Sequence, residues 1–155
     1  MQCPRELCLA RSQGQTRLSL PPLLKHGFVC RYNLRDISRK LVDLAKDSIE
    51  MDFNIFIRYL LEDEDASVRV NAIDGLWEDE DRTLIPPLVG FLRCDPDARV
   101  RAAAAQNLRR FVLLREYGRI TDSDASLIND ALLTTIRSAN EPLELRACAL
   151  ESLAY

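Results

Sequence analysis

Several residue types on which other folds depend are scarce in this chain of 155 residues. Aromatic residues make up only 6%, glycine occurs five times and histidine once. Strands favour aromatic and β-branched residues, whereas Ala, Leu, Arg and Glu favour helices, so this composition indicates an all-α chain. No apolar run approaches the roughly 18 residues of a membrane span, and the start lacks the continuous apolar stretch of a secretory signal.

The means for catalysis are equally sparse. The single histidine, His26, lies in the basic first part of the chain, which disfavours nucleophile activation by a Ser-His or Cys-His pair. Gly75 and Gly90 are isolated, so no glycine-rich phosphate loop is present. We therefore expect no enzyme, with no catalytic residue, no cofactor and no metal.

Five cysteines, an odd number at irregular spacing, argue against a disulfide framework and favour a reducing, cytoplasmic setting. One alternative is a zinc site, whose spacing is loose compared with ordinary fingers. Its ligands would be Cys3, Cys8, His26 and Cys30. Cys94 and Cys148 are instead interpreted as small core or junction residues.

Charge divides the chain into two parts. Residues 1–40 hold eight Lys/Arg and two acids, net +6, whereas residues 41–155 hold 13 and 22, net −9. We interpret residues 1–32 as a basic, poorly ordered arm, and residues 33–155 as the folded part. An organelle-targeting arm is one alternative, and contact of the arm with nucleic acid or an anionic membrane is another. No aromatic residues interleave the basic ones in a stacking pattern, which disfavours binding of single-stranded nucleic acid.

A repeat is visible in the acidic part. Seven residues, Asp63, Asp65, Ala66, Val68, Arg69, Ala72 and Leu76, recur 32 positions later as Asp95, Asp97, Ala98, Val100, Arg101, Ala104 and Leu108. A weaker third copy, 45 positions after the second, holds Leu145, Arg146, Ala149 and Leu153. The extra length is expected within residues 114–123. Such regular repetition is typical of a solenoid.

Each copy predicts two helices from its apolar spacing. The first pair is expected at about residues 52–61 and 66–77, with Phe53, Phe56, Ile57, Leu60 and Leu61 on the buried face of its first helix. Buried faces of the third pair include Ile128, Leu132, Ile136, Leu145, Ala149, Leu150 and Leu153. A leading helix over about residues 36–46, with Ile37, Leu41, Leu44 and Ala45 on one face, is expected to pack ahead of them.

Helix boundaries also have sequence markers. Asp65, Asp97 and Asn140 are predicted N-caps, and residues 122–124 are predicted to cap the first helix of the third pair. Pro86 and Pro87 belong near a helix start. Small residues such as Ala72 and Ala104 sit mid-helix, where neighbouring helices approach closely.

These motifs resemble the HEAT-repeat family, in its bacterial form related to phycobilisome-lyase-type repeats, over about residues 52–155. The resemblance implies an α–α superhelix of about three helical pairs plus the leading helix. It also implies a polar ladder between neighbouring units. The ladder residues would be Asp63, Arg69, Asp95, Arg101 and Arg146, with Asn140 departing from the pattern where an aspartate is expected.

Solenoids bind extended partners along the concave face, which the second helices are expected to line. The exposed positions predicted there from helical phase are Asn71, Asp74, Ala103, Gln106, Arg110, Glu144 and Glu151. Two acidic runs, residues 62–65 and 78–81, are interpreted as caps and solvated turns, with a cation site or a basic partner as alternatives. Trp77 either packs on the next repeat or anchors a partner.

The preferred function is therefore a protein-interaction scaffold whose partner the sequence does not name. One alternative, implied by the resemblance alone, is a bilin lyase or chaperone. Another is nucleic-acid association through the arm, which the sequence disfavours. The chain ends at Tyr155 directly after an apolar helix, so a truncated solenoid, or self-association through this end, is also expected.

Overall fold

The computed structural model describes residues 31–47 and 53–154, and every regular element in these ranges is helical. Residues 1–30, which include all four proposed zinc ligands and all but the last two residues of the predicted arm (1–32), lie outside the described residues. Residues 31 and 32 belong to the first described helix, two residues earlier than the predicted start of the folded part. The helices are α2 (Arg31–Asp47), α3 (Asn54–Leu60), α4 (Ala66–Gly75), the short 3-10 turn η3 (Arg82–Leu84), α5 (Ile85–Cys94), α6 (Ala98–Glu116), α7 (Asp122–Arg137) and α8 (Leu143–Leu153). None of them is long and apolar enough to cross a membrane.

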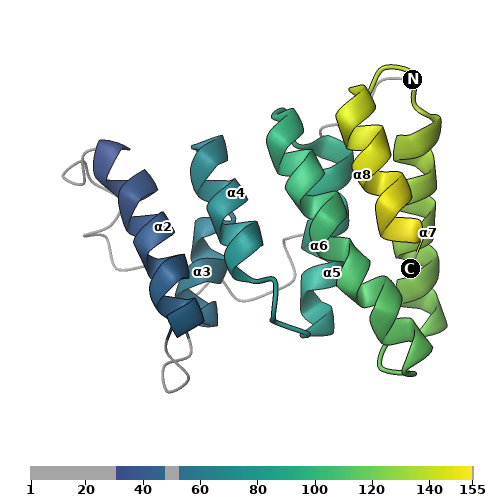
Figure 1. Ribbon diagram of the computed structural model, residues 1–155, viewed down its shortest axis with the longest axis horizontal. Helices are drawn as coiled ribbons and strands as arrows, with labels where there is room; N and C mark the ends of the chain where they lie inside the picture. The colour runs from purple at the N-terminus through teal and green to yellow at the C-terminus, as the bar shows by residue number, and fades with distance from the viewer. Residues whose placement is uncertain (1–30, 48–52, 155) are drawn as a thin grey trace, which may run out of the picture.

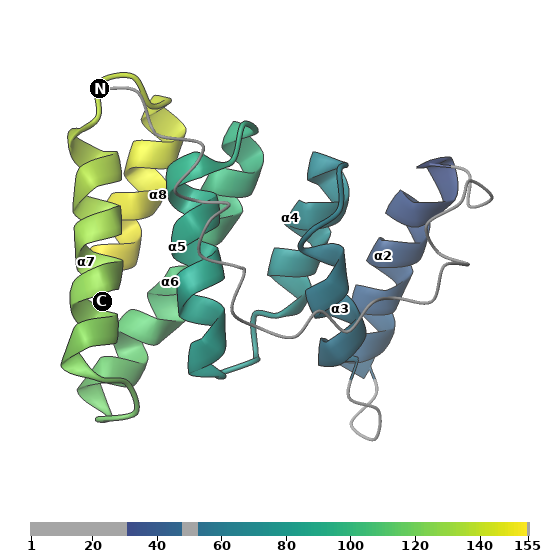
Figure 2. The ribbon, with the colours of Figure 1, turned by 180° about the vertical axis from the view of Figure 1, so that it is seen from behind.

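The helices form two layers (Figures 1 and 2). The second helices α4, α6 and α8 pack side by side, and α2 extends this layer beyond α4. The first helices α3, α5 and α7 lie behind them, each against the second helix of its own pair. This arrangement is the HEAT-like solenoid that the repeat predicts, and α2 occupies the place expected for the leading helix.

A single core runs through these layers. Its buried apolar residues extend without interruption from Val42 on α2 to Ala149 on α8. Ala72, Ala104 and Ala149 are fully buried, as expected for positions where second helices approach closely. Phe111 is the largest fully buried side chain. A lone helical pair could not bury its apolar face in this way, so each unit depends on its neighbours.

Four predicted core positions are wrong. Phe56 and Leu150 are 63% and 58% exposed, and Ile37 and Leu44 are also exposed. All four lie on helices near the two ends of the described solenoid, α2, α3 and α8. A helix at the end of a stack has neighbours on fewer sides, so its apolar stripe is only partly covered.

The helix boundaries follow their caps. The carboxylates of Asp65 and Asp97 accept hydrogen bonds from the backbone N–H of Ser67 and Arg99, both as predicted. Asn140, in contrast, does not cap α8, whose N-cap is Pro142. The cap of α7 is Thr121 rather than a residue of 122–124, and it forms a capping box.

In that box, the Thr121 hydroxyl accepts from the Asp124 backbone N–H, while the Asp124 carboxylate accepts from the Thr121 backbone N–H. These two bonds satisfy groups that helix geometry leaves without a partner. The prolines Pro86 and Pro87 stand in the first turn of α5, where a missing N–H costs little.

The extra length before the third copy mostly lengthens helices. α6 has 19 residues against ten in α4, and α7 has 16 against ten in α5. α6 ends at a tight turn in which Gly118 adopts φ 67°, a conformation that glycine tolerates best. The Arg119 N–H then donates to the Leu114 carbonyl at 3.0 Å, which closes the helix.

Candidate functional site

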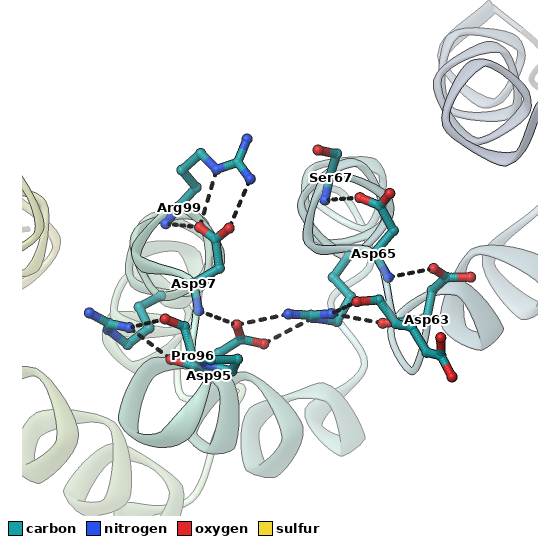
Figure 3. A network of polar contacts seen from close by, with 10 residues as sticks. Asp63, Asp65, Ser67, Asp95, Pro96, Asp97 and Arg99 are labelled. Atoms are coloured by element: carbon teal, nitrogen blue, oxygen red, sulfur yellow. Dashed lines mark hydrogen bonds and ion pairs between the residues drawn. The ribbon is translucent and has the colours of Figure 1, made fainter. Parts of the chain in front are cut away.

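The repeated aspartate and arginine form a buried rung between the first and second units (Figure 3). Arg69 on α4 donates from Nε to Oδ2 and from Nη2 to Oδ1 of Asp95, each at 2.9 Å. Its third nitrogen, Nη1, donates to the carbonyls of Asp63 and Glu64 at 2.8 and 3.0 Å. The Arg69 guanidinium therefore stabilises the turn before α4 in its own unit and binds the carboxylate of the second unit with a bidentate contact.

A second rung joins the second and third units. Arg101 uses Nη1 on the carbonyls of Asp95 and Pro96, and its Nε and Nη2 both donate to Oε2 of Glu141. Asn140, the residue in phase with Asp95, does not supply the carboxylate. Arg146, the third arginine, donates from Nε to the Ile136 carbonyl at 2.9 Å.

The aspartates of the repeat, Asp63 and Asp65 in the first unit and Asp95 and Asp97 in the second, also organise their own turns. Oδ1 of Asp63 and of Asp95 accepts the N–H two residues ahead, from Asp65 and Asp97 at 2.8 and 2.9 Å (Figure 3). The hydrogen bonds from Arg99 lower the pKa of Asp97 from 3.8 to about 2. Asp63 and Asp65 of the first acidic run, like Asp95 and Asp97 of the second unit, therefore shape the turns that precede α4 and α6.

The second acidic run lies in the linker between α4 and η3, and arginines from three parts of the chain contact this linker. Arg58 on α3 donates to Asp79 and Asp81, with Nη2 to oxygen distances of 2.6 and 2.9 Å. The Arg110 guanidinium, on α6, donates to the Leu76 carbonyl. Arg119 forms an ion pair with Glu80. Within the described residues, no three His, Cys, Asp or Glu side chains are grouped to hold a metal ion.

The predicted partner-binding residues fall into two groups. Four are exposed on the second helices: Asp74 on α4, Gln106 on α6, and Glu144 and Glu151 on α8. Asn71 is half-buried, because its Nδ2 donates to the Ser38 hydroxyl of α2 at 2.9 Å. The exposed four therefore define the candidate surface, which spans α4, α6 and α8 and which we call the second-helix surface.

Two predictions on α6 are wrong. Ala103, expected to be exposed, is only 6% exposed. The reason is that α6 contacts α4, α5, α7 and α8, which leaves a narrow free strip. Arg110 is half-buried above the Phe111 ring, with Cζ 4.6 Å from the centroid, and burial lowers its pKa to about 10. It holds the end of α4 and is not free to contact a partner.

Trp77 and the cysteines also differ in part from expectation. Trp77 is 59% exposed, which favours the interpretation of an anchor over packing on the next repeat. Its indole N–H lies 3.4 Å from a Glu78 carboxylate oxygen. Cys94 is exposed at the end of α5, which fits a junction residue and not a core residue. Cys148 is half-buried, with its sulfur 3.5 Å from Nε2 of Gln106.

Sequence reasoning missed several contacts that join the units. Asn107, buried on α6, donates to the Ile73 carbonyl at 2.7 Å, and Ser152 donates to the Ala105 carbonyl at 2.9 Å. A polar residue amid an apolar helical stripe, as Asn107 is beside Leu108, is the one signal that could have indicated them.

Comparison with known proteins agrees with this geometry. The family of HEAT repeats matches residues 54–154, from the start of α3 to the end of α8. Neither the curated proteins nor the solved structures contain a match to the chain. The match covers about two-thirds of the sequence and includes all three helical pairs, so the chain belongs to the HEAT-repeat family.

Proposed function

We propose that this protein is an interaction module that binds a protein partner along the second-helix surface and has no catalytic activity of its own. HEAT repeats generally mediate contacts between proteins. The observation that carries the proposal is the side-by-side packing of α2, α4, α6 and α8, which gives one continuous layer of helices (Figure 1). Such a layer offers an extended platform instead of a closed pocket.

The chemistry of this surface suggests the kind of partner. Asp74 on α4 and Glu144 and Glu151 on α8 place exposed acids on both sides of α6. Gln106 lies between them and can both donate and accept hydrogen bonds. We therefore propose an extended segment that carries basic side chains, since opposite charge guides association and fixes orientation.

The rungs give this surface its stiffness. Arg69 with Asp95, and Arg101 with Glu141, join neighbouring units through bidentate or shared contacts. A surface whose helices are fixed relative to one another loses less entropy when it binds. In the proposed function, the ladder therefore acts on binding indirectly, by holding the platform in one shape.

Site-specific photo-crosslinking in the full chain tests the proposal. A benzophenone amino acid is placed at Gln106 on the second-helix surface or, as a matched control, at the exposed Ser126 on the first helix α7. We expect a discrete crosslinked protein from source lysate only with the probe at Gln106. Equal crosslinking from both positions, or from Ser126 alone, would contradict the proposed surface.

The narrower resemblance to phycobilisome-lyase-type repeats supports a second hypothesis, in which the module assists bilin attachment. Only the shared repeat favours it, and a fold can host many functions. Incubation of the full chain with bilin, followed by zinc-enhanced fluorescence of the separated protein, tests it. A bilin adduct would support this hypothesis; its absence with a competent acceptor protein present would refute it.

Contact with nucleic acid through the basic arm, and self-association through α8, stay hypotheses. Residues 1–30 of the arm lie outside the described residues. At the other end, Leu143 and Leu150 on α8 are exposed. Sedimentation of the full chain over a range of concentrations tests self-association. Measurement of DNA or RNA binding at several salt concentrations tests nucleic-acid contact, for which a steep loss of affinity with salt is expected.

A further inference from the structure

An apolar face is left uncovered where α2 and α3 meet. Its exposed side chains are Ile37 and Leu44 on α2 and Ile55, Phe56 and Tyr59 on α3. Single exposed apolar residues are ordinary, but five of them on two helices that contact each other point to a face that another segment covers.

In the next unit of the repeat, the position that corresponds to Phe56 is buried in the core. Phe56 stands 32 positions before Leu88, the interval that separates the first two units. Leu88 is 2% exposed, whereas Phe56 is 63% exposed. On α3, Phe56 is two residues from Arg58, and so points to the opposite side of the helix. Since Arg58 contacts the linker toward the second unit, Phe56 lies on the side away from that unit.

The missing neighbour can be identified from the layers. α4, α6 and α8 each pack against a first helix that precedes them, α3, α5 and α7. α2 lies in the second-helix layer, yet no first helix precedes it among the described residues. Its Ser38 and Val42 stand 34 positions before Ala72 and Leu76, so α2 is in phase with the other second helices.

The sequence before α2 contains a fitting segment. Leu20-Pro21-Pro22-Leu23-Leu24 resembles Ile85-Pro86-Pro87-Leu88-Val89, the start of α5, 65 positions later. Two unit intervals, 34 and 32, add to 66, so this likeness falls almost in register. Leu23 occupies the place of Leu88, and six residues, 25–30, separate Leu24 from the start of α2 at Arg31.

We propose that residues 20–30 of this chain cover the apolar face of α2 and α3, with a first helix that begins near residue 20 and a short turn before Arg31, so that this helix and α2 form a fourth helical pair. Leu23 and Leu24 would contact Phe56 and the exposed stripe of α2. The folded part would then begin near residue 20, and the basic arm would be shortened to the residues before it. The partner-binding platform gains no new helix, because the added helix joins the first-helix layer.

Hydrogen exchange of the full chain, read by mass spectrometry, tests this. We expect amides of residues 23–30 to exchange about tenfold or more slowly than in an unstructured peptide, at all protein concentrations. Phe56→Ser should abolish that protection. Because Phe56 is exposed in the described fold, the variant leaves the rest folded. Leu150→Ser, at a similarly exposed leucine on α8, is the matched control and should leave the protection unchanged.

Three results would overturn the proposal. Residues 23–30 could exchange at the unstructured rate in the unaltered chain. They could stay equally protected in Phe56→Ser. Protection could also appear only at high concentration, together with a dimer in sedimentation, which would make a second copy of the chain the occupant. None of these outcomes depends on whether the second-helix surface binds a partner.

Discussion

Removal of the Asp95 carboxylate should lower the free energy of unfolding by an amount that can be worked out from the contacts of this side chain. Asp95 accepts two hydrogen bonds from Arg69, both at 2.9 Å, and a third from the Asp97 backbone N–H. The side chains of Arg69 and Asp95 are only 10% and 5% exposed. Asp95→Ala would leave the guanidinium in this buried place without its counter-charge.

The expected cost follows from that burial. Loss of one partner from a buried, hydrogen-bonded ion pair typically costs about 3–5 kcal/mol. The Asp63 and Glu64 carbonyls continue to accept from Arg69, so we expect the low end, about 3 kcal/mol in the free energy of unfolding. For a chain of this size, that corresponds to a fall in melting temperature of roughly 10 °C.

Glu141→Ala is the matched control, because it breaks the other rung in a wetter setting. The Arg101 and Glu141 side chains are 15% and 23% exposed, and one carboxylate oxygen accepts both bonds. We expect a loss of about 1 kcal/mol there. Urea denaturation of both variants, with Arg69→Ala and the double variant to isolate the coupling, measures the difference. Equal costs for Asp95→Ala and Glu141→Ala, or a cost below about 1 kcal/mol for both, would refute the reasoning.

Further predictions concern helix packing and pH. A Cβ added at Gly75 would lie 2.6 Å from Cγ2 of Val42, whereas one added at Gly90 meets nothing within 4 Å. We therefore expect Gly75→Ala to destabilise the fold by about 1–3 kcal/mol and Gly90→Ala to stabilise it by up to ~1 kcal/mol, as thermal unfolding would show; the opposite order would contradict the contact of α4 with α2. The pKa of Asp97 is lowered from 3.8 to about 2, so its stabilising contribution is complete above pH 3.8 and is lost as the pH falls toward 2. Asp97→Asn should thus flatten the loss of stability over that range in acid titrations, and an unchanged slope would argue against the cap.

The fold was largely predictable because the repeated residues act within a single helix or at its cap. Val68, Ala72 and Leu76 recur with helical spacing, and an aspartate immediately before the first helical residue marks the start of each of these helices. The placement of α2 ahead of the first pair followed from the same apolar pattern. Such signals depend on a single helix and its caps, so they can be recognised in the sequence without knowing which helices pack beside it.

The exposure of individual side chains and the acceptor of the second rung were less predictable, because both depend on residues far along the chain. Ala103 is buried because α6 has contacts on four sides, and Phe56 is exposed at the end of the described stack. Glu141 supplies the carboxylate to Arg101 although Asn140 is in phase with Asp95. The N-cap of α8 is Pro142, two residues after Asn140, and no side chain caps this helix. The helix therefore starts later than the repeat predicts, and Asn140 lies in the turn before it.

The most direct test of the central claim, that the second-helix surface binds a protein, is the affinity of the crosslinked partner for two variants of the full chain. One removes three exposed polar side chains of that surface, as Asp74→Ala, Gln106→Ala and Glu151→Ala. The other removes exposed polar side chains of the first helix α7, as Ser126→Ala and Asp130→Ala. We predict at least about tenfold weaker binding for the first variant, equivalent to ~1.4 kcal/mol, and unchanged binding for the second. Unchanged binding for the first variant, with its folding intact, would contradict the account.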